Sequence, residues 1–86
     1  MTAADLLSQS QIRWRCRRGV RELDVLLTDF LDVQYANLSQ TDKQSFERLL
    51  EIQDPKIMDY LFDKDQLDDD GVNRILGLLK TQSGLS

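Results

Sequence analysis

The apolar residues of this chain recur at the spacing of an α-helix rather than with the alternation of a β-strand. Residues 20–35 are the clearest case, because their apolar positions follow the i, i+3, i+4, i+7, i+8 pattern. Such positions share one stripe of a helix, which predicts an amphipathic helix here. The stripe contains Leu23, Leu26, Leu27, Phe30 and Leu31.

Two further helices are predicted on either side of an Asp-Pro dipeptide. Ser39 is a good N-cap and Asp42 follows it in a capping-box-like position, so a third helix is predicted to start there and to stop near Gln53. Asp54 is a second N-cap and Pro55 suits the first helical position, which predicts a fourth helix immediately afterwards. Their buried stripes are predicted to contain Phe46, Leu49 and Leu50 in the third helix, and Ile57, Met58, Leu61 and Phe62 in the fourth.

A first and a last helix complete the pattern. Residues 9–18 predict a helix that ends at Gly19, since glycine suits the left-handed position after a helix C-terminus. After a polar connection over 63–71, an acidic cluster and an apolar stripe predict the last helix. We expect residues 1–8 and 82–86 to be frayed. The cluster is Asp68 to Asp70, and the stripe contains Val72, Ile75, Leu76 and Leu79.

Together these elements predict an all-α fold, a small single-domain five-helix bundle over residues 1–86. With 41% hydrophobic and 30% charged residues, the chain has the composition of a globular domain. Its apolar runs are far shorter than the roughly 20 residues that span a bilayer. No signal peptide opens the chain, so we expect a cytoplasmic protein without membrane insertion.

The chain contains no histidine and one cysteine, Cys16. Without histidine it lacks the commonest general base and the usual activator of a nucleophilic serine or cysteine, so we expect no self-contained catalysis. A lone cysteine forms no intramolecular disulfide, and no zinc-ligand set is present. The aspartates between Asp63 and Asp70 fit no register of a calcium-binding EF-hand loop, so we interpret them as helix caps.

Charge is distributed unevenly along the chain. Residues 1–21 carry five arginines against one acid, whereas residues 22–86 carry six bases against fourteen acids. The acidic remainder would repel a polyphosphate backbone, so we expect the basic end to meet a protein partner and not a nucleic acid.

A helical wheel divides the first helix into two faces. Ile12 and Cys16 lie about 40° apart and are predicted to face the core. Trp14 lies on the opposite face among arginines, a composition typical of a binding hot spot. An equally weighted alternative is that Trp14 packs on a neighbouring helix while the arginines extend around it.

Two pairs of charges near this helix have different interpretations. Arg13 and Arg17 are a like-charge i, i+4 pair, a cost that a partner would explain. Arg18 and Glu22 carry the signs that the two adjoining helix dipoles prefer, so capping is a structural explanation for them.

The stretch WRCRRGVRELD contains Arg18, Gly19 and Glu22 in the arrangement RGxxE. It resembles the signature of the SdhE family, also called succinate dehydrogenase assembly factor 2. The resemblance covers roughly residues 10–80 and includes the following stretch LDVLLTDFLDVQYANLSQTDKQSFERLLEIQDPKIMDYL. Family members often carry a basic residue where this chain has Gln11.

The resemblance implies a five-helix FAD assembly factor that promotes covalent attachment of FAD to the flavoprotein subunit of succinate dehydrogenase and, in bacteria, of fumarate reductase. The flavin is attached to a histidine of the partner, so no cofactor bound stably by this chain is expected. Without the N-terminal extension of mitochondrial members, the chain resembles a bacterial one, and we expect a monomer. An alternative drawn from the same family is an antitoxin-like module that affects cytoskeletal polymerisation.

The same resemblance assigns the partner-binding residues. The corner between the first two helices would dock on the flavoprotein near its FAD site. Gly19 would let the corner close tightly, Arg18 would meet acidic partner groups, and Glu22 would accept a hydrogen bond. The motif's surroundings add Trp14, Arg17, Arg21 and Asp24, and the like-charge pair with Arg17 adds Arg13.

Overall fold

The computed structural model describes residues 9–84, and within that range the chain is all-α without a strand. This confirms the predicted fold class, whereas the frayed start expected for residues 1–8 lies outside the described residues. A short 3-10 helix joins α2 to α3. The elements are α1 (Gln9–Arg15), α2 (Arg21–Val33), the 3-10 helix η2 (Tyr35–Asn37), α3 (Gln40–Leu50), α4 (Asp54–Leu61) and α5 (Asp70–Ser83).

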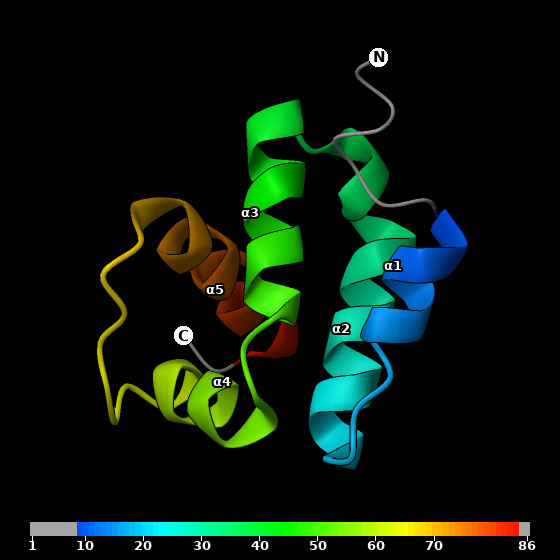
Figure 1. Ribbon diagram of the computed structural model, residues 1–86. Coiled ribbons are helices and arrows are strands. Elements are labelled where there is room, and N and C mark those ends of the chain that lie inside the picture. Colours follow the sequence, from blue (N-terminus) through cyan, green and yellow to red (C-terminus); the bar gives the residue numbers. More distant parts are fainter. Residues whose placement is uncertain (1–8, 85–86) are drawn as a thin grey trace.

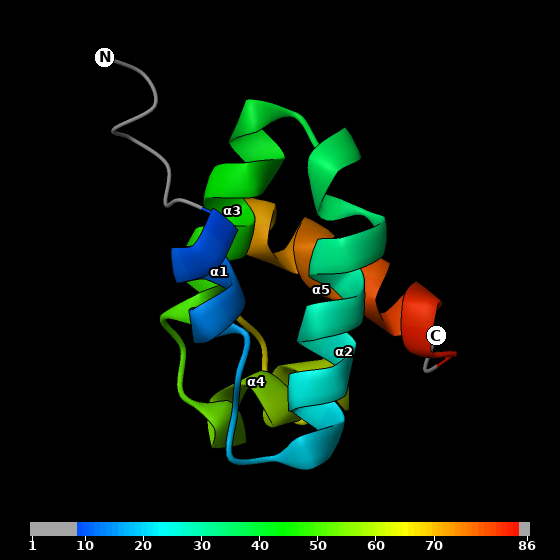
Figure 2. The same cartoon turned by 90° about the vertical axis from the view of Figure 1, so that its right-hand side faces the viewer.

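The long helices surround one core, and α4 and α1 close it from below and from the side. α3 packs most closely against α5, while α1 lies beside α2 and α4 lies below them (Figures 1 and 2). The ring of Phe46 lies 5.0 Å from that of Phe30 and 5.6 Å from that of Tyr35, which ties α3 to α2 and η2. Most of the predicted stripes are buried, as Leu23, Leu27, Phe30, Leu31, Phe46, Leu49, Leu50, Ile57, Leu61, Val72, Ile75, Leu76 and Leu79.

Two predicted helix starts are confirmed by their caps. The Ser39 hydroxyl accepts a hydrogen bond from the Asp42 amide at 3.1 Å, and the Asp69 carboxylate accepts one from the Val72 amide at 3.1 Å. The carboxylate of Asp42 itself accepts from Arg74 on α5 at 3.2 Å instead of completing a capping box. Local polar residues thus start α3 and α5, and one of them also joins the two helices.

Two predicted boundaries are wrong. α3 ends at Leu50 rather than near Gln53. α5 continues to Ser83, and residues 85–86 of the end that we expected to be frayed lie outside the described residues. Gly84, with φ 80°, ends α5 in the left-handed conformation that glycine tolerates without steric cost. The N-cap of α4 is Gln53, because the carboxylate of Asp54 is used elsewhere, as described below.

The first helix also ends earlier than predicted. α1 stops at Arg15 rather than at residue 18, and the Cys16 amide donates to the carbonyls of Ile12 and Arg13 in a tightened last turn. Gly19 does not have the positive φ expected of a C-terminal glycine. Residues 17–20 therefore form a non-helical connection that leaves the Arg18 side chain free to turn inward.

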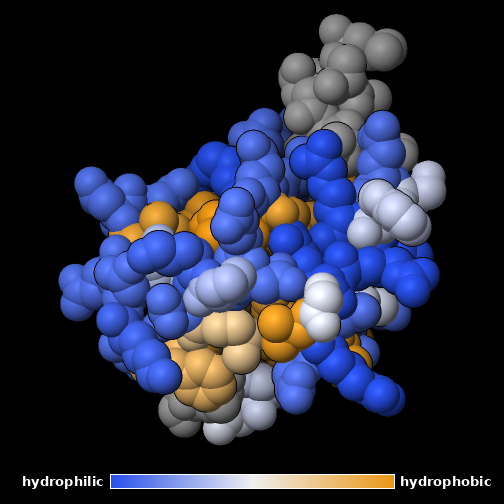
Figure 3. Space-filling model, turned by 60° about the horizontal axis from the view of Figure 1, so that its bottom comes forward, coloured by the Kyte–Doolittle hydropathy of each residue, from blue (hydrophilic) through white to orange (hydrophobic). Residues whose placement is uncertain are grey.

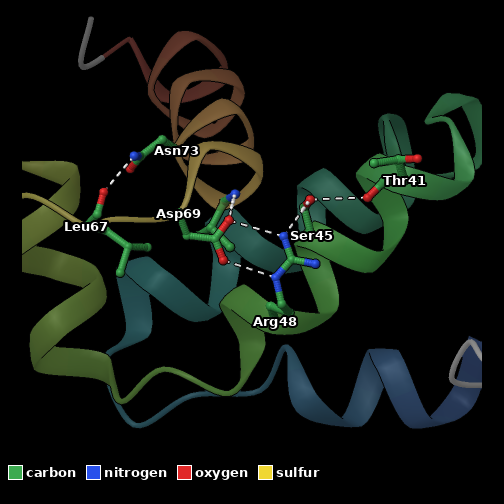
Figure 4. A network of polar contacts seen from close by, with 7 residues as sticks. Thr41, Ser45, Arg48, Leu67, Asp69 and Asn73 are labelled. Atoms are coloured by element: carbon green, nitrogen blue, oxygen red, sulfur yellow. Dashed lines mark hydrogen bonds and ion pairs between the residues drawn. The ribbon is translucent and has the colours of Figure 1, made fainter.

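A polar network clamps α3 to the start of α5. Arg48 donates to both carboxylate oxygens of Asp69, at 3.0 and 3.1 Å, and to the Ser45 hydroxyl at 3.2 Å. Ser45 in turn donates to the Thr41 carbonyl at 3.1 Å (Figure 4). The hydrogen bond from Arg48 lowers the pKa of the Asp69 carboxyl. Asp69 thus serves as the N-cap of α5 and as an anchor for α3.

Gly71 of α5 lies directly against side chains of α3, and this contact generates a prediction. A Cβ atom at this position would lie 2.8 Å from Arg48 Nη2 and closer still to Ser45 Oγ. Gly71→Ala should therefore displace the hydroxyl of a buried serine and lower the free energy of unfolding by about 1–3 kcal/mol. Urea unfolding followed by circular dichroism measures this loss.

The matched control is Gly77, which lies in the same helix and has nothing within 4 Å of the point that a Cβ atom would occupy. Gly77→Ala should raise the free energy of unfolding by about 0.5–1 kcal/mol, because alanine has the higher helix propensity. Equal effects of the two substitutions would contradict the close approach at Gly71.

Candidate functional site

The connection between α1 and α2 is held by one arginine. Arg18 Nη1 donates to the Ile52 carbonyl and to Asp54 Oδ1, each at 3.2 Å, and Nη2 donates to the Leu50 carbonyl. The Leu50 carbonyl belongs to the last residue of α3 and the Ile52 carbonyl to the turn that follows it. A cation at this end of the helix interacts favourably with the helix dipole and with the terminal carbonyls. Arg18 therefore fastens the α1–α2 corner to the α3–α4 corner.

The second oxygen of the same carboxylate holds the backbone. Asp54 Oδ2 accepts hydrogen bonds from the Gly19 amide at 3.2 Å and the Val20 amide at 3.5 Å. The Asp54 carboxylate thus binds one guanidinium and two consecutive amides. We call this arrangement of Arg18, Gly19, Val20 and Asp54 the corner latch.

Arg18 does not lie where the sequence placed it. Its side chain is 11% exposed and its three hydrogen bonds all point into the molecule, whereas we expected it on the outer surface. The physical reason is the early end of α1, which lets the side chain reach carbonyls that otherwise have no partner. Glu22, its companion in the motif, is exposed, and its carboxylate makes no hydrogen bond or ion pair with any described residue.

Gly19 is exposed and has no internal reason to be glycine. Its φ is not positive, and a Cβ there would meet Asp54 Oδ2 at 3.9 Å, an ordinary van der Waals distance. The expectation that Gly19 closes a tight turn is therefore wrong.

The outer side of the corner carries an exposed aromatic ring and unpaired charges. Trp14 is 73% exposed, which decides between its two interpretations in favour of an outward position. Arg17 and Arg21 are also exposed, and their guanidinium groups contact no charged partner within residues 9–84. These side chains, with Glu22, are available to another molecule.

One recess beside the corner brings together three predicted residues. Arg13, Arg17 and Asp24 line it with Thr28, whose hydroxyl donates to the Asp24 carboxylate at 3.3 Å. Arg13 also pairs with Asp32 at 2.5 Å, and this hydrogen bond raises the pKa of Arg13. The ion pair with Asp32 offsets the repulsion between Arg13 and Arg17, so no binding partner is needed to explain why these two arginines lie four residues apart.

A second recess lies beside Glu22 and was missed in the sequence. Arg21 and Glu22 line it with Val25, and Glu22 also borders an apolar groove with Phe62. Phe62 was expected in the core but is 49% exposed, because α4 ends at Leu61 and the next residue turns outward. Figure 3 shows apolar side chains among hydrophilic ones at this end of the molecule. The remaining groove residues are Leu23, Leu26, Met58, Leu61 and Ser83.

Cys16 is buried, as predicted. Burial raises its pKa to about 11, although Arg18 and Arg13 act in the opposite direction. Within residues 9–84 no cluster of His, Cys, Asp or Glu has the arrangement of a metal site. In the same range no helix is long and apolar enough to cross a membrane.

Comparison with known proteins identifies relatives over nearly the whole chain. Residues 10–83 match the family Sdh5, described as "Flavinator of succinate dehydrogenase". The chain is 35% identical over 79 residues to the FAD assembly factor SdhE of a Serratia species, which covers 92% of this chain and 90% of that protein. It is 36% identical over 76 residues to the FAD assembly factor SdhE of Pectobacterium atrosepticum, covering 88% and 86%.

The buried thiol leads to a labelling prediction. With a pKa of about 11, roughly one Cys16 in a thousand is a thiolate at pH 8, and even that fraction is sterically shielded. Ellman's reagent at pH 8 should therefore modify the native protein slowly and the urea-unfolded protein at once. Rapid modification without denaturant would contradict the burial.

The geometry at Gly19 predicts a silent substitution. Gly19→Ala should change the free energy of unfolding by less than about 0.5 kcal/mol, because nothing inside the molecule opposes a methyl group. Gly84→Ala is the control, since it forces alanine into the left-handed conformation and should cost about 1 kcal/mol. Chemical denaturation of both variants tests the contrast, and a large loss at Gly19 would show that its backbone needs glycine.

Proposed function

Because the chain belongs to the Sdh5 family, the flavinators of succinate dehydrogenase, we propose that it is an FAD assembly factor that docks on the flavoprotein subunit of that enzyme. Its contribution is to promote covalent attachment of FAD to this subunit. The proposed docking surface is the outer side of the corner, formed by Trp14, Arg17, Gly19, Arg21 and Glu22.

The observation that carries this proposal is the contrast within the RGxxE motif. The Arg18 guanidinium donates its three hydrogen bonds to groups within the chain. The Glu22 carboxylate, in contrast, is exposed and has no partner within residues 9–84. The backbone of Gly19 is exposed at the surface, and no contact within the chain requires glycine at this position. A partner that approaches this backbone closely would explain why residue 19 is glycine, since any side chain there would separate the two surfaces.

The neighbouring residues suit a protein interface. Tryptophan and arginine are the residues most often found at binding hot spots, and Trp14 is 73% exposed beside exposed arginines. The apolar groove next to Glu22, with Phe62 at its edge, adds surface that a partner can bury. Arg13 and Asp24 already have partners in the chain and would contribute at the rim.

The mechanism we propose is positional. The family resemblance implies that the histidine that receives the flavin belongs to the flavoprotein, and the lack of histidine in this chain fits that division of roles. We expect this chain to supply no catalytic residue of its own. Docking would hold the flavoprotein in a conformation in which that histidine and the flavin are close and aligned. FAD would remain on the partner rather than bind stably to this chain.

We extend the proposal to the flavoprotein of fumarate reductase as a second client, and to a cytoplasmic monomer as the working form. The alternative antitoxin role gains no support from the structure or from the names of the relatives. Restored flavin attachment without restored cell shape in a deletion strain would separate the two roles.

Docking through the corner predicts the effect of two substitutions. Gly19→Arg should block close approach and Glu22→Ala should remove a polar contact, so each should weaken binding to the succinate dehydrogenase flavoprotein by about tenfold, or ~1.4 kcal/mol. Covalent flavin on that flavoprotein should fall in consequence. The measurement is flavin fluorescence of the denatured flavoprotein in a gel, after co-expression in a strain without its own assembly factor.

Asp68→Ala is the control for Glu22→Ala, because it removes an exposed acid from the connection between α4 and α5. It should leave flavin attachment unchanged, and all variants should remain helical by circular dichroism. Normal flavin attachment with both corner variants would exclude docking through this surface, and normal attachment without any assembly factor would exclude the function.

A further inference from the structure

The corner latch depends on a residue that lies outside the RGxxE motif. Asp54, at the start of α4, is 36 residues from Arg18 and 35 from Gly19 along the chain, yet it accepts hydrogen bonds from both. The motif's arginine and glycine thus meet a carboxylate that the motif does not contain.

We propose that Asp54 is a positioning residue for docking: its carboxylate fixes the backbone of the corner so that Gly19 and Glu22 face the flavoprotein. The inference rests on the proposed function. It assigns the first half of the motif, Arg18, to an internal role and the second half, Glu22, to the partner.

Burial distinguishes this ion pair from the others among the described residues. The Arg18 and Asp54 side chains are 11% and 18% exposed, whereas every other pair within residues 9–84 has at least one member that is 49% exposed or more. A pair withdrawn from water in this way is costly to break, because the remaining charge loses its partner in a poorly solvated place. The latch is therefore more persistent than a surface ion pair. It restrains a connection whose helix-type backbone hydrogen bonds lie at its two ends, from the Arg17 amide to the Trp14 carbonyl and from the Asp24 amide to the Val20 carbonyl.

The chemistry of the carboxylate explains why an isosteric amide cannot replace it. Asp54 receives a guanidinium on one oxygen and two backbone amides on the other, so all its contacts are with donors. In Asp54→Asn one of these oxygens becomes an NH2 group, which places donor against donor. Either Arg18 or the Gly19 backbone must then move, and Glu22 follows three residues later.

Asp69 is a matched control for this substitution. Its carboxylate also accepts from an arginine, Arg48, and from a backbone amide, that of Val72, but it joins α3 to α5 and lies outside the corner. Asp54→Asn and Asp69→Asn should each lower the melting temperature, because the first disrupts the corner latch and the second disrupts the contact of Arg48 with Asp69. Only Asp54→Asn should weaken docking.

The experiment is a titration of the purified succinate dehydrogenase flavoprotein, prepared without covalent flavin, with each variant at a temperature where both are folded. We expect the Kd to rise at least about tenfold for Asp54→Asn and less than about twofold for Asp69→Asn. Equal losses would overturn the proposal, since they would reflect general destabilisation. Unchanged affinity of Asp54→Asn beside weakened Glu22→Ala would also overturn it while leaving the proposed function intact.

A double-mutant cycle tests whether Arg18 acts through the latch. If Asp54 and Arg18 act only through their ion pair, the double variant Arg18→Ala/Asp54→Ala should bind the flavoprotein no more weakly than the weaker-binding single variant. Additive losses would show that Arg18 also touches the flavoprotein and would overturn its purely internal role. Absence of binding by the unaltered protein would instead remove the proposed function, and the positioning role with it.

Discussion

The carboxylate of Asp54 joins two chain corners that the hydrophobic core alone would leave loosely related. It lies at the end of a buried framework in which α3 packs on α5, yet the α1–α2 connection that it holds contributes few apolar side chains of its own. Three donors converge on it from that connection. The geometry of the candidate site therefore depends on this polar contact as well as on the packing of Cys16 and Val20 against the core.

The rest of the molecule gives this contact a rigid base. The aromatic contacts of Phe46 tie α3 to α2 and η2, and the Arg48–Asp69 clamp ties α3 to α5. Because α3 is held on both sides, its C-terminal carbonyls present a fixed acceptor set to Arg18. Stability and site geometry are thus linked through the end of one helix.

A docking corner built in this way separates two requirements. Internal residues define the shape of the backbone, and exposed residues such as Trp14 and Glu22 remain free of internal partners within residues 9–84. For an assembly factor that contributes position rather than bond chemistry, a surface already held in one arrangement loses less conformational entropy when the partner binds. Family membership and the geometry of the corner therefore support the same interpretation of the motif.

The sequence by itself determined the all-α class, most of the buried stripes, the cap at Ser39, a cap within the cluster Asp68 to Asp70 and, through RGxxE, the family. These features depend on residues within a few positions of one another, where helical period and capping act. Only the tertiary structure decided that Arg18 turns inward, that Asp54 receives it, and that Phe62 is exposed. The first two outcomes depend on where the end of α3 meets a connection more than 30 residues away in sequence, and no local pattern encodes that meeting. The exposure of Phe62 depends on the end of α4 at Leu61.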